Sequence, residues 1–136
     1  WMAEKESAVF VIATANAIDK LPAELLRKGR FDEIFFLDLP NSEERLSILD
    51  LHLKKRRPSY RFPLSTIIDR TDGFSGAELE QAVIEGMHIS FSESRELMEK
   101  DLIKAVSELV PLSRTAKEQI NLLKEWSTTG RARSAS

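Results

Sequence analysis

Residues 25–32 read Leu-Leu-Arg-Lys-Gly-Arg-Phe-Asp, and the apolar run Ile-Phe-Phe-Leu follows at residues 34–37. This stretch sets two arginines, Arg27 and Arg30, three positions apart just before a strand-like segment. An arginine presents a planar, permanently charged fork that can bind two phosphate oxygens and can stabilise charge on a transferred γ-phosphoryl group. The alternative is that both side chains only cover the end of a short helix, where cations are favoured. The sequence upstream favours the anion-binding role.

The segment upstream is an apolar, β-branched run that ends at a polar amide. Residues 9–15 read Val-Phe-Val-Ile-Ala-Thr-Ala, and Asn16 follows. The pattern predicts a buried strand near residues 8–14, and the later run predicts a second strand near residues 33–38. Ligands of open parallel sheets lie outside the carboxyl ends of the strands, so Asn16 is placed to orient a water or a phosphate oxygen. A lone asparagine after a strand is usually a turn residue, but Arg27 eleven residues later makes the combination specific.

This combination resembles the second half of the ATPase module of the AAA family, which forms rings. By that resemblance, Asn16 corresponds to the sensor 1 residue that helps to hold the attacking water in its own subunit. Arg27 and Arg30 correspond to the arginine fingers, which act on the nucleotide of the neighbouring subunit. The resemblance implies ATP and Mg²⁺ as cofactors of the full-length protein. It also implies a homo-oligomeric ring, with a hexamer expected, in which an isolated subunit hydrolyses ATP poorly.

Two further motifs extend the resemblance into a helical lid. Residues 44–52 read Glu-Arg-Leu-Ser-Ile-Leu-Asp-Leu-His, and residues 73–79 read Gly-Phe-Ser-Gly-Ala-Glu-Leu. In the family, the first motif borders the adenine and the ribose, and the second lets the backbone approach the base. The residues that carry over are Ile48, His52, Gly76 and Ala77. Taken alone, a histidine on a helix is more often structural, and residues 75–78 form a capping box whether or not a nucleotide binds.

The phosphate-binding motifs are missing from the sequence. No Gly-x-x-x-x-Gly-Lys-Ser/Thr occurs, so the backbone cradle, the phosphate lysine and the Mg²⁺-binding hydroxyl are absent, and we expect that this chain cannot hold ATP alone. Residues 34–38 resemble a Walker B strand, but Leu39 follows where an acidic base would stand. That run fits the last strand of the module better. Trp1 is not an initiator and residues 1–5 read as the last turn of a helix, so we expect the sequence to start within a domain. We favour a truncated sequence over an aggregation-prone piece.

A narrower resemblance comes from both ends of the chain and from Lys28, where most AAA proteins have proline. This resemblance rests on residues 1–5, 111–115 and 130–136 together with Lys28. It points to the AAA proteins of cyanobacteria and plastid genomes that are named only as hypothetical chloroplast reading frames. The expected location is the cytoplasm or the plastid stroma. One departure from the family is Leu21-Pro22-Ala23, where many members have Ile-Asp-Pro, which leaves the cap of the short arginine-bearing helix open, with Asp19 as a candidate.

Composition narrows the possible partners. The chain has 136 residues, a formal net charge of −2, no cysteine and two histidines. The negative net charge argues against a nucleic-acid partner. A small nucleic-acid-binding patch stays open as an alternative, because the basic residues 54–57 lie close in sequence to Tyr60, Arg61 and Phe62. No disulfide or thiolate metal site is possible, and no metal ligands are expected. No apolar stretch is long enough to span a bilayer.

The predicted fold class is α/β, with the last two strands of a partial P-loop NTPase parallel sheet followed by an all-α lid subdomain. The predicted divisions are residues 1–40 for the truncated α/β part, 41–129 for the lid and 130–136 for a flexible tail. By the family's strand order, the two predicted strands should not pair with each other. A helix capped by Asn41 or Ser42 should span 42–57 and stop before Pro58. Further helices are predicted at 64–70, 75–90, 101–110 and 114–127, with Gly86 allowing close packing against another helix.

The sequence thus predicts a fragment of an AAA ATPase that couples ATP hydrolysis to remodelling of a protein partner of unknown identity. The alternative is a non-enzymatic helical interaction module that kept the lid and lost the ATPase. A third reading, DNA remodelling by an AAA+ relative, ranks last because the chain is not basic. A Walker A lysine and an acidic pair upstream would distinguish the enzyme from the module.

Overall fold

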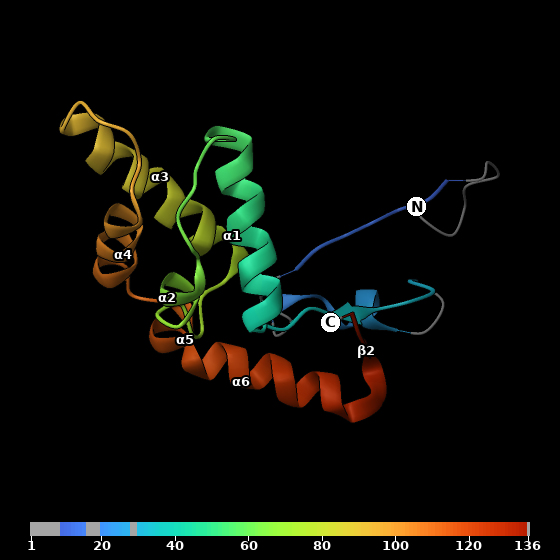
Figure 1. Ribbon diagram of the computed structural model, residues 1–136. Coiled ribbons are helices and arrows are strands. Elements are labelled where there is room, and N and C mark those ends of the chain that lie inside the picture. Colours follow the sequence, from blue (N-terminus) through green and yellow to red (C-terminus); the bar gives the residue numbers. More distant parts are fainter. Residues whose placement is uncertain (1–8, 16–19, 28–29, 136) are drawn as a thin grey trace. The chain divides into compact units, whose positions relative to one another are not determined.

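The computed structural model of the protein describes residues 9–15, 20–27 and 30–135. These residues form two compact units, one from the described parts of 1–38 and 118–136 and the other from residues 39–117. The second unit is built from α1 (Ser42–Arg56), α2 (Ser65–Ile68), α3 (Gly76–Ser92), α4 (Glu99–Glu108) and α5 (Leu112–Thr115). In Figure 1, α1 and α4 pack on either side of α3.

The first helix, α1, begins with a reciprocal cap. The Asn41 side chain accepts a hydrogen bond from the Glu44 N–H at 3.0 Å, and the Glu44 carboxylate accepts one from the Asn41 N–H at 2.8 Å. Acidic residues in the first turn and basic residues in the last turn complement the helix dipole, and the helix ends just before Pro58. Of the two predicted capping residues, Asn41 is therefore the cap.

The core of residues 39–117 lies between α1, α2, α3 and α4. Its fully buried aliphatic side chains include Leu49, Leu53, Ile67, Leu79, Val83 and Leu102. A Cβ built on Gly86 would lie 2.7 Å from Leu102 Cδ2, so the predicted close packing at Gly86 is confirmed, and the neighbour is α4.

The turn between α3 and α4 is held by a bidentate ion pair. Arg95 donates to the two carboxylate oxygens of Asp101 at 2.7 and 2.6 Å, and Asp101 also accepts from the Met98 N–H at 2.9 Å. The Asp101 residue is 2% exposed, and the Arg95 guanidinium holds the pKa of its carboxyl below the usual range. This pair fixes the start of α4.

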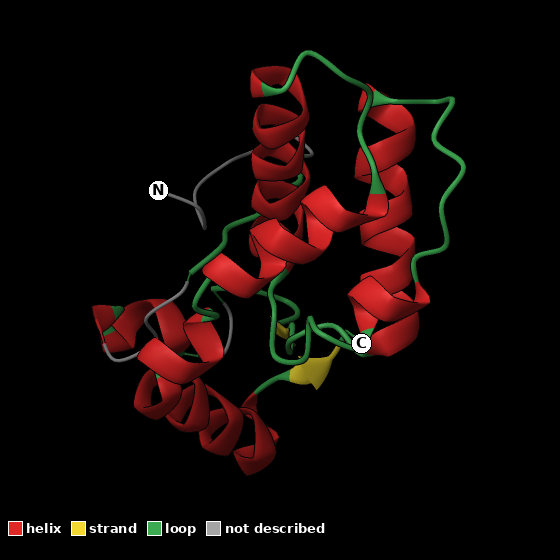
Figure 2. Ribbon diagram, turned by 60° about the vertical axis from the view of Figure 1, so that its left-hand side comes forward, coloured by secondary structure: helices red, strands yellow, loops and turns green. Residues whose placement is uncertain are grey.

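The strands are shorter than predicted. Strand β1 (Phe35–Phe36) pairs in parallel with β2 (Arg133–Ser134), shown in yellow in Figure 2. The predicted fold class, parallel strands followed by a helical subdomain, is confirmed. The predicted 33–38 strand is reduced to β1, and residues 133–135, expected in a flexible tail, contribute backbone hydrogen bonds to Ile34 and Phe36 at 2.8 and 3.0 Å.

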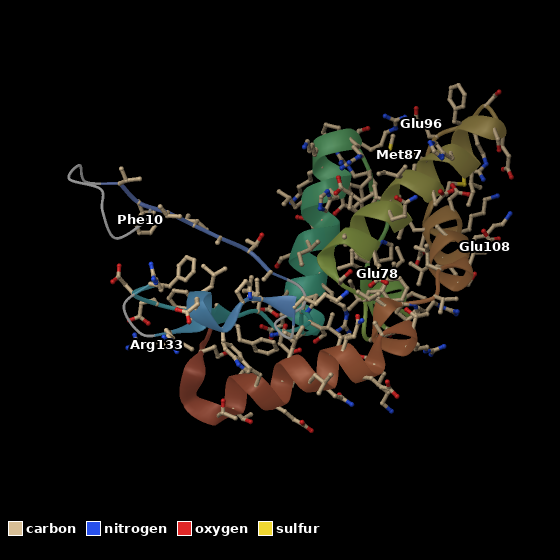
Figure 3. All side chains as sticks on the ribbon, turned by 180° about the vertical axis from the view of Figure 1, so that it is seen from behind. Phe10, Glu78, Met87, Glu96, Glu108 and Arg133 are labelled. Carbon is tan, nitrogen blue, oxygen red and sulfur yellow. The ribbon has the colours of Figure 1, made fainter. Side chains whose placement is uncertain are left out.

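The predicted strand near residues 8–14 is not formed. Residues 9–15 have no regular secondary structure, and Phe10 and Ile12 are 89% and 78% exposed. Figure 3 shows Phe10 on this extended segment. An apolar strand needs neighbours on its edges and cover on its faces, and none of the described residues supplies them here.

The predicted 114–127 helix is interrupted. It divides into α5 and α6 (Lys117–Trp126), and a π-helical turn, η4 (Ser127–Arg131), leads from α6 to β2. Lys124 of α6 pairs with Asp38 at 3.0 Å. Among the helices that the structure describes, none is both long and apolar enough to cross a bilayer.

Candidate functional site

The pair formed by α1 and α3 brings together residues that the sequence motifs singled out. Ile48 and His52 are four positions apart on α1 and therefore share a face. A Cβ built on Gly76, the first residue of α3, would lie 3.8 Å from Ile48 Cδ1. Ala77 is exposed on the same first turn of α3. Ile48 and Gly76 thus face each other between α1 and α3, which we call the α1/α3 seam, with His52 one turn further along α1 and Ala77 next to Gly76.

Packing does not explain why residue 76 is a glycine. Gly73 has a φ of 75°, and an added Cβ there would lie 2.4 Å from Ser113 Oγ. A Cβ on Gly86 would meet Leu102. At Gly76 an added Cβ would make only ordinary van der Waals contact with Ile48. Unlike Gly73 and Gly86, Gly76 leaves open backbone that a ligand could approach.

The first turn of α3 is held in place from two directions. The predicted capping box is confirmed: the Glu78 carboxylate accepts from the Ser75 N–H at 2.7 Å, and the Ser75 hydroxyl accepts from the Glu78 N–H at 3.4 Å. The second oxygen of Glu78 accepts from the Leu112 N–H at 2.5 Å. Glu78 therefore joins the starts of α3 and α5, and Figure 3 labels it. This arrangement fixes the backbone beside Gly76.

His52 lies in a charged cluster that crosses from α1 to α3. Arg56 Nη1 lies 3.2 Å from His52 Nδ1. Arg56 Nη2 donates a hydrogen bond to Glu80 Oε1 at 2.5 Å. Glu80 Oε1 is also 3.4 Å from His52 Nδ1. The hydrogen bond from Arg56 is the main reason that the pKa of Glu80 is lowered.

Arg56 and Glu80 were not foreseen as site residues. The four-residue spacing of His52 and Arg56 on one helix was a usable signal. The contact to Glu80, which lies on another helix, had no local signal in the sequence.

The arginine of the first helical motif has a structural role. Arg45 is 8% exposed, and its Nε donates to Thr71 Oγ1 at 3.2 Å, while Nη1 donates to the Pro40 carbonyl at 3.0 Å. It therefore ties the start of α1 to the loop that leads into α3. This linkage fixes the position of the start of α1 relative to the loop between α2 and α3.

The arginine-bearing segment leaves Arg27 and Arg30 on the surface. A short 3₁₀ turn, η3 (Ala23–Leu26), begins after Pro22, which makes no side-chain cap, and ends at Arg27. The Arg27 side chain is 73% exposed and lies 3.4 Å from Glu24 Oε1, which is exposed as well. Arg30 is exposed, and its N–H donates to the Arg27 carbonyl at 3.3 Å. Asn16 and Asp19 lie outside the described residues.

The aromatic residues 60 and 62 lie at a separate cavity of about 330 Å³. It is lined by Arg57, Ser59, Tyr60, Arg61, Phe62, Glu96, Leu97, Met98 and Glu99. Burial and a hydrogen bond to Asp50 raise the pKa of Tyr60 to about 12. The two glutamates disfavour a nucleic-acid backbone at this surface. Among the described residues, no group of three histidines, aspartates or glutamates is arranged to hold a metal ion.

Comparisons with known proteins agree with the sequence motifs. The model of the ATPase family associated with various cellular activities (AAA) matches residues 1–39. The chain is 53% identical over 138 residues to the uncharacterized AAA domain-containing protein ycf46 of Pyropia yezoensis, and this alignment covers all of the chain but 28% of that relative.

Other AAA relatives match over shorter regions. The proteasome-activating nucleotidase of Aeropyrum pernix is 39% identical over 102 residues, which cover 74% of this chain and 25% of that protein. The ATP-dependent zinc metalloprotease FtsH of Mesomycoplasma conjunctivae is 36% identical over 107 residues, 78% of this chain and 14% of the enzyme. The predicted resemblance is thereby confirmed, and the chain belongs to the AAA family.

Proposed function

We propose that this chain supplies part of the ATP site of an AAA ATPase and the arginines that complete the site of a neighbouring subunit. The α1/α3 seam would border the base and the ribose, and Asn16 would act as sensor 1. In the complete protein, ATP hydrolysis would drive remodelling of a protein partner within a homo-oligomeric ring, with a hexamer expected. The ycf46 relatives agree with the narrower resemblance, from which we expect a location in the cytoplasm or the plastid stroma.

The observation that carries the proposal is the seam itself. Ile48 offers an apolar edge, His52 a hydrogen-bonding ring, and Gly76 a backbone without a side chain of its own, where an added Cβ would lie 3.8 Å from Ile48 Cδ1. Base-binding sites combine apolar contact with a few placed polar groups, and this seam has both. The residues therefore fit the nucleoside part of ATP, whereas its phosphates and Mg²⁺ would need the phosphate-binding loop, which is absent from these residues.

The arginines fit a role in trans because they are exposed. Arg27 makes one ion-pair contact in the described structure, with a glutamate that is itself 64% exposed, and such pairs contribute little. Its guanidinium can therefore turn to an anion without leaving a buried carboxylate unpaired. When bound, MgATP supplies the phosphoryl group and its charge, and an arginine from a neighbour stabilises the charge that develops on it.

The test uses the Pyropia yezoensis relative in which this chain replaces the aligned region. We expect Gly76→Leu to weaken ATP binding, because the new side chain would cover the seam. We expect Arg27→Ala and Arg30→Ala to lower turnover by up to about 10³-fold while ATP binding is retained. Isothermal titration and steady-state ATPase assays measure both quantities.

Arg70→Ala is the matched control, since Arg70 is an exposed arginine outside these motifs. It should change neither binding nor turnover. Unchanged turnover in both finger variants would refute the role in trans, and unchanged ATP affinity in Gly76→Leu would refute the seam. If the parent chimera neither bound nor hydrolysed ATP, the helical interaction module would replace the ATPase as the better account.

A further inference from the structure

Arg56 contacts both His52 and Glu80, and this shared contact constrains the imidazole. Its Nη1 lies 3.2 Å from His52 Nδ1, and its Nη2 donates to Glu80 Oε1 at 2.5 Å. A guanidinium has donors only, so the His52 nitrogen facing it must offer a lone pair. In a neutral imidazole one nitrogen carries the proton and the other accepts. With Nδ1 accepting, the proton is on Nε2.

Glu80 favours the opposite arrangement. Its Oε1 is 3.4 Å from the same His52 Nδ1, and a carboxylate beside a ring nitrogen draws the imidazole proton to that nitrogen. The shorter contact from Arg56 to Glu80 Oε1 offsets part of the negative charge on that oxygen and so weakens its attraction for the proton. The side chains of His52 and Arg56 are only 19% and 22% exposed, whereas that of Glu80 is 39% exposed, so water competes less for the two nitrogen-bearing groups than for the carboxylate. Arg56 therefore favours the Nε2–H tautomer of His52, whereas Glu80 alone would favour the Nδ1–H tautomer.

We propose that Arg56 is a positioning residue that fixes neutral His52 as the Nε2–H tautomer, so that the α1/α3 seam presents a hydrogen-bond donor to its ligand. Such a donor pairs with an atom that has a free lone pair, either a ring nitrogen of the base or an oxygen of the sugar. A ligand group that can only donate, such as an exocyclic amine, finds no partner there. The part that concerns the ligand rests on the proposed nucleotide site, whereas the tautomer of the free chain does not.

The tautomer can be read directly by long-range ¹H–¹⁵N correlation spectroscopy on the 136-residue chain. The spectra are recorded at alkaline pH, and the ¹⁵N chemical shifts themselves report whether the ring is neutral. We expect the parent chain to show the lone pair on His52 Nδ1 and the proton on Nε2. In Arg56→Met, Glu80 is left alone beside Nδ1, and the signals should move toward the Nδ1–H tautomer.

Two controls separate the effect of Arg56 from a general change in the chain. The side chain of His88 is 70% exposed, with Glu85 Oε2 at 3.9 Å from its Nδ1. It is a second histidine beside a glutamate, and among the described residues no arginine pairs with it. Its signals should not respond to Arg56→Met. In the double variant Arg56→Met with Glu80→Gln, the carboxylate is gone as well, and His52 should return to the Nε2–H form that an isolated imidazole prefers.

Three results would overturn the proposal. An Nδ1–H tautomer in the parent chain does so without any variant, and so does a His52 spectrum that is the same in parent and folded Arg56→Met. The third concerns the ligand: in the Pyropia chimera, Arg56→Met should weaken ATP binding roughly three- to ten-fold, as for one lost hydrogen bond, while Arg70→Ala does not. Unchanged affinity in Arg56→Met, with ATP bound by the parent, refutes the donor role at the ligand. If the parent chimera binds no ATP, the proposed function fails, and the tautomer result still decides the role of Arg56.

Discussion

Residues 39–117 and the described part of residues 9–38 both contain apolar runs, but they bury them very differently. Leu49, Leu79 and Leu102 of the helical unit are 0% exposed, whereas Phe10 and Leu37 are 89% and 74% exposed. A helix satisfies its backbone hydrogen bonds within itself, so a few short helices can close a core with neighbours that are near in sequence. A strand depends on partners that the sequence supplies elsewhere. The comparison shows that the helical unit carries its own core, while residues 9–15 do not.

The largest expected effect sharpens this comparison directly. Leu49→Ala removes a fully buried side chain and should lower the free energy of unfolding by roughly 2–5 kcal/mol. Ile12→Ala, at a residue 78% exposed, should change it by less than about 0.5 kcal/mol. Urea denaturation followed by far-UV circular dichroism measures both. Similar costs at the two positions would mean that residues 9–15 are as well packed as the helical core.

A polar contact of the helical unit should give the next largest effect. Asp101→Ala removes the acceptor of Arg95 and of the Met98 N–H, and we expect a loss of about 2 kcal/mol in the free energy of unfolding. Lys54→Ala breaks a pair with Asp50 in which Lys54 is 64% exposed and should cost at most about 0.5 kcal/mol. Equal costs for the two variants would contradict the buried character of the Asp101 pair.

The same pair makes a pH-dependent contribution to stability. Because Arg95 lowers the pKa of Asp101 in the folded chain, the contribution is present above the unfolded value of about 3.9 and is lost as the pH falls through the folded pKa. Between about pH 6 and pH 3, the free energy of unfolding of the parent chain should therefore fall more steeply with decreasing pH than that of Asp101→Ala. Parallel curves would contradict this linkage.

Two neighbouring glycines give a smaller and more selective effect. Gly73→Ala should cost about 1–2 kcal/mol of unfolding free energy, since the residue has a φ of 75° and the new methyl group would meet Ser113. Gly76→Ala should be neutral or slightly stabilising, because its methyl group meets only Ile48 at 3.8 Å. Thermal unfolding of both variants is the measurement. A clear loss in Gly76→Ala would show that packing, rather than a ligand, accounts for this glycine.

The smallest expected effect concerns the junction at which the helical unit begins. Asn41→Ala removes the side-chain acceptor for the Glu44 N–H and should cost about 1 kcal/mol. Asn41→Ser keeps an acceptor at the cap and should recover most of that loss. Equal stability of the alanine and serine variants would show that the side-chain hydrogen bond at the cap does not contribute to the free energy of unfolding.

Local signals account for what the sequence predicted well. The positions of α1 and α3, the capping box at Ser75, and the close approach at Gly86 all depend on residues within a few positions of one another or on one missing side chain. The same holds for the motifs that singled out Ile48 and Gly76, which face each other between α1 and α3.

Contacts between distant residues account for what was missed. The strand pairing of Phe35 with Arg133 joins segments almost a hundred positions apart, and no pattern in either segment specifies the other. Glu80 reaches Arg56 from a second helix, and the hydroxyl of Tyr60 reaches Asp50 from a loop. The predicted strand near 8–14 was wrong for a related reason: its apolar pattern describes a buried position, and burial needs neighbours that the described residues do not provide.

Subunit mixing tests the proposed role of Arg27 and Arg30 most directly. One subunit is the Pyropia chimera with both arginines changed to alanine. The other is the chimera in which the Walker A lysine that the proposal expects upstream of this chain is substituted. Each should be nearly inactive alone. If the arginines act in trans, mixing the two should restore ATP turnover, because sites that keep the lysine gain arginines from the neighbour. Turnover that stays at the sum of the two inactive proteins, in rings shown to contain both, would contradict the account.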